Sequence, residues 1–389
     1  MSSISPDRDL DEPKVGSDAV LRVADLDDLI DVLANAGYTV EGPVVRDGAV
    51  VSGTLRAAAD LPRGVRDQQT AGHYRLHESD DDELFGWAVG PQSWKPAFFP
   101  AHQEVWRAVV VDGHVTIRPS ASTPAPRALI GVRPCDVAAL GVLDRVLAEG
   151  AYPDPSYVDR REGTFVVVVE CGRPAATCFC LAMATGPGAT GGYDLALTEL
   201  VDPGNHRFYV RVGTARGAEV LARVRHEAAT AADRDGRGTV VAAAEERLSQ
   251  RQPPPEVRHL LGRHLDPERW LDVAGRCLSC GNCTLVCPTC FCSDVRDVSD
   301  IAGTLRRERT WASCFDLDHS YLHGGAVRAS AASRYRQWLT HKFSTWWDQF
   351  DTSGCVGCGR CVTWCPGEID VVDETLELAR FDAVSQVQS

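Results

Sequence analysis

Residues 277–288 read CLSCGNCTLVCP, and residues 355–366 read CVGCGRCVTWCP. Both stretches have the spacing C-x2-C-x2-C-x3-C-P, which is the ligand pattern of bacterial proteins that hold two iron–sulfur clusters. Three cysteines at i, i+3 and i+6 wrap a loop around one cluster, and the fourth points away toward a second cluster. Two copies of the motif complete each other, so the sequence predicts two 4Fe-4S clusters.

The doubled motif assigns ligands crosswise, with three from one copy and the fourth from the other. The expected ligands are Cys277, Cys280, Cys283 and Cys365 for the first cluster, and Cys355, Cys358, Cys361 and Cys287 for the second. Pro288 and Pro366 end the local backbone hydrogen bonding, while Gly281, Gly357 and Gly359 let the backbone approach the sulfides. The alternative metal is zinc, but zinc prefers four ligands in separated pairs, so this pattern favours clusters.

Four further cysteines lie upstream, close to the ends of predicted buried strands. Cys135 follows the apolar run RALIGV, Cys171 follows TFVVVVE, and Cys178 and Cys180 come a few residues later in CFC. Loops at the carboxyl ends of strands converge on one crevice in open α/β sheets. A third 4Fe-4S cluster on Cys135, Cys171, Cys178 and Cys180 is one hypothesis, and four free buried cysteines are the other. An iron count of about twelve rather than about eight per chain separates them.

Three cysteines remain outside these groups: Cys290 and Cys292 in CPTCFC, and Cys314 in WASCFD. They could bind another metal with the help of Asp316 or His319, but three thiols alone do not complete a site. We therefore expect these three cysteines to pack around the clusters.

The distribution of cysteines divides the chain. Residues 1–134 contain none, and their density rises after Cys277, just beyond a proline-rich stretch that predicts an extended linker near residues 245–258. We expect an α+β protein: a mixed α/β N-terminal domain followed by a C-terminal bacterial-type two-cluster ferredoxin-like domain with a helical insertion. The expected ranges are a disordered tail at 1–16, the mixed α/β domain at 17–250, the dicluster domain at 259–375 with its insertion at 293–350, and a tail at 376–389.

Apolar runs predict several strands and helices. RALIGV (127–132), TFVVVV (164–169) and HRFYVRV read as strands, VWRAVVVDGHVTIRP reads as two strands joined at residues 111–114, and residues 218–227 and 239–250 read as surface helices. The sequence has no P-loop and no convincing GxGxxG fingerprint, because GPGATGG at residues 186–192 has the wrong spacing and reads as a loop.

Between Cys287 and Cys355 lie 67 residues, and the insertion among them includes a helix-like run, GAVRASAASRYRQWLTHKFSTWWDQF. This run sets Arg328, Arg334, Arg336 and Lys342 among Trp338, Phe343, Trp346 and Trp347. It is either a docking surface near the clusters, or a helix with an aromatic core face and a solvated basic face.

Composition narrows the class of protein. At 389 residues and 42.2 kDa the chain exceeds one usual core, so two domains are expected. The net charge of −14 argues against nucleic acid as a partner. No apolar run approaches the roughly 20 residues of a membrane span, and the polar start MSSISPDRDLDEPK lacks a signal core. We expect a cytoplasmic protein whose 15 cysteines serve as metal ligands or redox groups.

Several motifs together resemble one known family. GVRPCD (131–136), ECGRPAATCFC (170–180), CLSCGNCTLVCPTCFC and SRYRQWLTHKF followed by CVGCGRCVTWCP resemble the beta subunit of soluble cytoplasmic NiFe hydrogenases, the sulfhydrogenases, which is also similar to the iron–sulfur subunit of anaerobic sulfite reductase. The resemblance covers residues 20–375, and all eight motif cysteines match. It implies an electron-transfer subunit whose partners are a flavin/NAD(P)H-binding iron–sulfur subunit and the NiFe hydrogenase small and large subunits.

The preferred function is therefore electron relay within a NAD(P)-linked NiFe hydrogenase, in which this chain positions and tunes clusters and performs no bond chemistry. One alternative is the equivalent subunit of an anaerobic sulfite reductase. Another is a stand-alone ferredoxin-like carrier, and a third is a structural or regulatory role for the clusters. No histidine or acid pair stands in a recognisable nucleophile or general-base arrangement, and the chain has neither a flavin fingerprint nor NiFe-ligating cysteine pairs.

Overall fold

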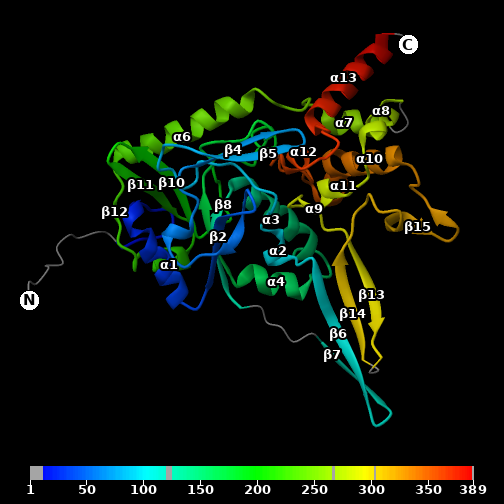
Figure 1. The fold of residues 1–389 in the computed structure, drawn as a ribbon, viewed down its shortest axis with the longest axis horizontal. Helices are drawn as coiled ribbons and strands as arrows, with labels where there is room; N and C mark the ends of the chain where they lie inside the picture. Colours follow the sequence, from blue (N-terminus) through cyan, green and yellow to red (C-terminus); the bar gives the residue numbers. More distant parts are fainter. Residues whose placement is uncertain (1–11, 120–124, 265–267, 302–303, 388–389) are drawn as a thin grey trace, which may run out of the picture.

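The computed structural model of the chain describes residues 12–119, 125–264, 268–301 and 304–387 (Figure 1). The part of the predicted N-terminal tail at residues 1–11 lies outside the described residues. The Gly16 backbone N–H donates to Val212 O at 2.9 Å, and the first strand begins at Asp18, so the end of the predicted tail is already attached to the sheet.

An eight-stranded mixed sheet forms the N-terminal part of the molecule. Four neighbouring strands, β10, β9, β8 and β2, run parallel, and the outer strands pair antiparallel. Its strands in spatial order are β12 (Glu227–Ala228), β1 (Asp18–Arg22), β11 (Asn205–Val212), β10 (Leu195–Asp202), β9 (Thr164–Val169), β8 (Arg127–Val132), β2 (Thr39–Arg46) and β3 (Ala49–Thr54). The predicted strands 127–132 and 164–169 are thus confirmed, and the structure shows that they lie side by side in the centre of this sheet.

Helices cover both faces of the sheet, which explains why its central strands are continuously apolar. In β9, Phe165, Val167 and Val169 pack on one side with α1 (Leu26–Asn35) and α5 (Ala215–Leu221). Val166 and Val168 pack on the other side with α2 (Lys95–Phe98), α3 (Pro134–Leu147) and α4 (Pro155–Glu162). The expectation of a mixed α/β fold is confirmed.

The two predicted surface helices are displaced from their expected ranges. The first ends at Leu221, and residues 227–228 form strand β12 instead. The second, α6 (Ala231–Ser249), begins eight residues early because Thr230 and Asp233 form a capping box, in which each side chain binds the backbone N–H of the other. The connection to α7 (Val257–Arg263) is correspondingly short, and Pro253 and Pro254 are buried in it.

A four-stranded antiparallel sheet projects from the body (Figure 1). The insertion at 293–350 was predicted to be helical, and the structure confirms helix at residues 331–350 but shows that its first part is a hairpin of this sheet. The insertion begins as a β-hairpin, β13 (Ser293–Ser299) and β14 (Leu305–Trp311), and β14 pairs with β6 (His102–Val111) of the N-terminal part. Strand β7 (His114–Pro119) completes the sheet, and its pairing with β6 confirms the two strands predicted within residues 105–119. The two predicted domains therefore share a sheet.

The C-terminal part is mainly helical around an aromatic core. Trp270, Tyr335, Trp338 and Phe343 are buried there beside the cysteine motifs. The elements are α8 (Arg269–Arg276), α9 (Asn282–Leu285), α10 (Ala331–Thr340), a π-helical turn η4 (His341–Thr345), α11 (Trp346–Phe350), α12 (Arg360–Thr363) and α13 (Val371–Val387). The remaining small elements are β4 (Val65–Thr70), β5 (His73–Glu78), β15 (Tyr321–Leu322), β16 (Gly325–Ala326) and the 3-10 turns at Val23–Asp25, Ala58–Asp60 and Asp318–Ser320.

Two expectations for this part need correction. The segment predicted as a tail from residue 376 is the continuation of α13, held down by the buried Leu378 and by an Arg263–Asp382 ion pair of 2.8 Å. The aromatic run of the insertion does face the core, as one interpretation held, but Arg334 and Lys342 are buried with it rather than solvated. In the described part of the chain, no helix is both long and apolar enough to cross a membrane.

Candidate iron–sulfur centres

The two cysteine motifs fold into matching loops. In each, a residue of positive φ follows the first cysteine by two positions, Ser279 in one and Gly357 in the other, and its N–H lies 3.4 Å from the sulfur of that first cysteine. A glycine at φ 76° then starts a four-residue helix in each, α9 and α12. Such backbone amides donate to sulfur and stabilise negative charge on it. Both loops are therefore shaped to present thiolates.

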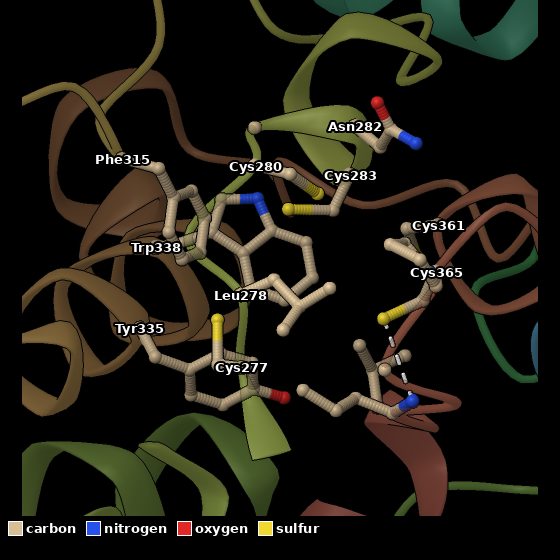
Figure 2. Close-up of a pocket in the computed structure, with 15 residues that line it drawn as sticks. Cys277, Leu278, Cys280, Asn282, Cys283, Phe315, Tyr335, Trp338, Cys361 and Cys365 are labelled. Carbon is tan, nitrogen blue, oxygen red and sulfur yellow. Dashed lines mark hydrogen bonds between the residues drawn. The ribbon is translucent and has the colours of Figure 1, made fainter. Parts of the chain in front are cut away.

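The first expected ligand set surrounds one cavity. Cys277, Cys280, Cys283 and Cys365 line one pocket, together with Cys361 of the second motif, so the fourth cysteine of the second motif reaches the loop of the first. Figure 2 shows their sulfur atoms around this pocket, with the rings of Phe315, Tyr335 and Trp338 beside it. The Ile369 backbone N–H donates to the Cys365 sulfur at 3.4 Å. The crosswise geometry fits a ligand that bridges the two motifs.

Electrostatics in this cavity fit a cationic metal core. Burial raises the pKa of Cys283 well above its usual value, and the charges of Cys314, Cys277 and Cys365 raise it further. Thiols crowded in this way stay protonated unless a positively charged group among them stabilises the thiolates. Bound there, an iron–sulfur cluster would supply one-electron transfer.

The second expected set is also brought together. Burial raises the pKa of Cys355 to about 12, and the nearby charges of Cys358 and Cys287 contribute to the shift. Cys361 interacts with the same cysteines and also with Cys283 of the first set. Cys287 thus lies with the second motif although it belongs to the first, as the crosswise prediction requires, and Cys361 lies between the two sets.

The described residues contain no group of three His, Cys, Asp or Glu side chains placed to hold a single metal ion. A zinc ion would require its four ligands to converge on one point. In a 4Fe-4S cube each thiolate binds a different iron, so the sulfurs stand apart around a larger body. Cys277, Cys280, Cys283 and Cys365 line a shared pocket, which is the kind of arrangement that a cluster needs.

The four upstream cysteines converge as well. Cys135 lies in the first turn of α3, directly after β8, and Cys171 follows the adjacent parallel strand β9. Cys135, Cys178 and Cys180 belong to one buried group. Burial raises the pKa of Cys180 to about 12, and charge on Cys171 adds to it. The structure thus places all four thiols near one another.

Arg133 holds this region together and was missed by sequence reasoning. Its guanidinium is 2% exposed and donates to the carbonyl oxygens of Val169 and Glu170, 3.4 and 3.3 Å away, at the end of β9. It also donates to Phe85 O at 2.9 Å. Because Arg133 itself follows β8, it fixes the loop of Cys135 relative to that of Cys171. The only signal was its place in the GVRPCD motif.

The upstream cysteines touch the second motif directly. The Cys178 thiol lies 3.6 Å from Cys358 O, and Phe179 N–H donates to Gly357 O at 2.8 Å. A side-chain carbon built on Gly357 would lie 2.6 Å from Phe179 backbone, and one on Gly359 would lie 2.7 Å from Thr177 backbone. These glycines therefore admit a second protein loop, in addition to the role that the sequence suggested for them.

The remaining cysteines, Cys290, Cys292 and Cys314, lie beside the candidate centres. The structure also places Lys95 and Lys342 near Cys287. The sequence had not indicated Lys95 at all, and it had placed Lys342 only in the possible docking surface. Hydrogen bonding with Cys290, together with nearby lysine charge, holds the pKa of Cys287 well below its usual range. Burial raises the pKa of Cys314 to about 12, and the charge of Cys292 contributes to the same shift. Cys290, Cys292 and Cys314 therefore surround the candidate centres, in agreement with the expectation that they pack there.

Comparisons with known proteins agree with this geometry. Residues 276–369 match the model of a 4Fe-4S dicluster domain. The sulfhydrogenase 2 subunit beta of Pyrococcus furiosus is 34% identical over 259 residues, which cover 64% of this chain and 74% of that protein. The dicluster match supports 4Fe-4S clusters as the bound groups.

Proposed function

Because the chain belongs to the family of sulfhydrogenase beta subunits, we propose that it is the iron–sulfur electron-transfer subunit of a multi-subunit hydrogenase. The observation that carries the proposal is the crosswise cavity, in which Cys365 of the second motif joins the three cysteines of the first. Two clusters held in this way would lie close together and exchange single electrons.

The proposed ligands are the eight motif cysteines in the two sets given above, and the proposed partners are those of a NAD(P)-linked complex. A flavin/NAD(P)H-binding iron–sulfur subunit would stand on one side of the electron path, and the NiFe hydrogenase small and large subunits on the other. Cys280 is exposed at the edge of the first cavity. An exposed ligand offers a short path to a partner's redox group, so we place one of the exchange points there.

A third cluster on Cys135, Cys171, Cys178 and Cys180 is part of the proposal. Its support is the convergence of the four thiols and the 3.6 Å approach of Cys178 to the Cys358 carbonyl. A centre there would lengthen the electron path beyond the second cluster, toward the end of the parallel strands.

Affinity purification of the tagged full chain from its native host tests the function. We expect a flavin subunit and the two hydrogenase subunits to co-purify, with hydrogen oxidation coupled to reduction of NAD⁺ or NADP⁺. Co-purification of a siroheme protein would assign the chain to a sulfite reductase instead. Recovery of a stable monomer without partners would overturn the subunit assignment and leave a stand-alone carrier.

A further inference from the structure

The lysines of this chain are few and unusually placed. There are three, Lys14, Lys95 and Lys342, among 40 basic residues. Lys14 is exposed, whereas Lys95 is 2% and Lys342 4% exposed. Lysine is rarely buried unless its charge is paired. The two buried lysines therefore require a compensating negative charge close by.

Lys342 is fixed between the two chain segments that carry Cys287 and Cys355. Its Nζ donates to Thr289 Oγ1 at 2.7 Å and to Gly354 O at 3.1 Å. Thr289 Oγ1 lies 3.2 Å from the Cys287 sulfur, and Gly354 directly precedes Cys355. The ammonium thus reaches Cys287 through the Thr289 hydroxyl and binds the residue next to Cys355. Both cysteines are ligands proposed for the second cluster.

Lys95 approaches the same region from the N-terminal part of the chain. Its Nζ donates to Cys290 O at 3.1 Å and stands 3.7 Å from the centre of the Trp311 ring. Burial lowers the pKa of Lys95, while the charges of Cys290 and Cys287 oppose that shift. Burial likewise opposes the charged form of Lys342, but the charges of Cys287, Cys290 and Cys355 outweigh it and raise the pKa of Lys342.

In the described part of the chain, no carboxylate oxygen lies within ion-pair distance of either ammonium, since neither lysine takes part in any ion pair of 4.0 Å or less. Arg360 also lies near the second set, but Asp136 neutralises it. The cysteines whose charges act on Lys342 are Cys287, Cys290 and Cys355, and two of them, Cys287 and Cys355, belong to the second set. A cluster bound there would be the missing counter-charge.

The first cavity has a different lining. Apart from its cysteines it is lined by uncharged side chains, chiefly Leu278, Phe315, Tyr335, Trp338 and Ile369. A buried guanidinium, that of Arg334, donates to Ser279 Oγ at 3.2 Å and to two backbone carbonyls, and the Ser279 N–H in turn donates to the Cys277 sulfur at 3.4 Å. The first set thus has one buried cation close to it, whereas two buried ammonium groups, those of Lys342 and Lys95, lie close to the second set.

Resting on the proposed function, we propose that Lys342, assisted by Lys95, raises the reduction potential of the cluster on Cys355, Cys358, Cys361 and Cys287 above that of the cluster in the first cavity. Reduction adds one negative charge to a cluster, and a fixed positive charge nearby stabilises the reduced form. Low polarity around the ammonium strengthens this effect. The second cluster is then the better electron acceptor of the two, so an electron that enters at the first cavity moves to the second.

Redox titration of the full chain, followed by electron paramagnetic resonance, tests the proposal. In K342M the midpoint potential of one cluster should move to a more negative value, while the cluster in the first cavity keeps its potential. K342R, which retains the charge, should stay close to the wild-type chain, and K95M should shift the same cluster in the same direction by a smaller amount. C280S, which alters a ligand of the first cavity, identifies the signal that must not move in K342M.

The outcomes are separable. Unchanged midpoints in K342M with full iron content would overturn the proposal, and equal shifts in K342M and K342R would assign the effect to packing rather than charge, which also overturns it. K342Q, whose amide can keep a hydrogen bond to Thr289, replaces K342M if that variant loses its clusters. Fewer than about eight irons in the wild-type chain would instead contradict the proposed pair of clusters itself.

Discussion

Arg360 and Asp136 form a bidentate ion pair, with Nη1 2.8 Å from Oδ1 and Nη2 2.9 Å from Oδ2, and their side chains are only 3% and 2% exposed. Arg360 lies between Cys358 and Cys361 of the second motif, and Asp136 directly follows Cys135. The Arg360 Nε also donates to Gly90 O at 3.1 Å. This pair therefore joins the loop of the second motif to the end of the parallel sheet.

Removal of this guanidinium should destabilise the protein strongly. R360M leaves the Asp136 carboxylate buried without its partner, and breaking a buried pair in this way costs about 3–5 kcal/mol of unfolding free energy. Anaerobic denaturant unfolding of the cluster-loaded chain measures the loss. R380M, which breaks the exposed Arg380–Glu377 pair, should cost less than about 1 kcal/mol. Similar losses in the two variants would contradict the structural role of the Arg360–Asp136 pair.

Two glycines at the same place in the two motifs allow a matched comparison. Gly281 and Gly359 both have φ 76°, so alanine adds about 1–2 kcal/mol of backbone strain at each. Only at Gly359 would the new methyl group meet backbone, 2.7 Å from Thr177, whereas at Gly281 it meets the Ser313 side chain at 3.1 Å. We expect G359A to lower the unfolding free energy clearly more than G281A in the same denaturant assay. An equal loss would mean that the contact between the two loops is easily rearranged.

The proposed third cluster makes a prediction about iron content. C180S removes one of its four thiols, so the iron count should fall from about twelve to about eight per chain. C314S is the control, because Cys314 is partly buried beside the centres without belonging to a proposed ligand set, and it should keep about twelve. A wild-type chain that already holds about eight irons would reject the third cluster. The four cysteines would then be ordinary buried thiols.

The parts of this architecture that depend on short sequence distances could be predicted, and those that depend on long ones could not. The runs at 127–132 and 164–169 signalled central strands because both of their faces are covered. The pairing of Ala108 with Leu305 joins segments almost two hundred residues apart, and nothing local indicates it. The aromatic run near its end is the strongest local pattern in the insertion, so sequence alone favours helix there and misses the hairpin.

In the candidate site, too, the sequence predicted the local features and missed the contacts between distant segments. The spacing of the cysteines signals the two sets, since each loop is local, and the structure places Cys365 and Cys287 crosswise as that spacing requires. The contact between Lys342 and Thr289 had no such signal, because 53 positions separate them. A basic residue in an aromatic helix reads as solvated unless the buried thiolates around it are known. The ligand assignment of the eight cysteines stays a prediction.

Removal of the clusters should unfold the motif loops while the sheet remains. Helices α9 and α12 have four residues each, too few to be stable alone, so their loops depend on the bound groups. Strand β9 is buried along its whole length by apolar side chains on both faces, independently of any cysteine. After iron is extracted anaerobically with a chelator, hydrogen exchange should become fast in residues 277–288 and 355–366 and stay slow in residues 164–169. Fast exchange throughout the chain would instead make the clusters necessary for the whole fold, and unchanged exchange in both motifs would contradict the proposed cysteine ligands.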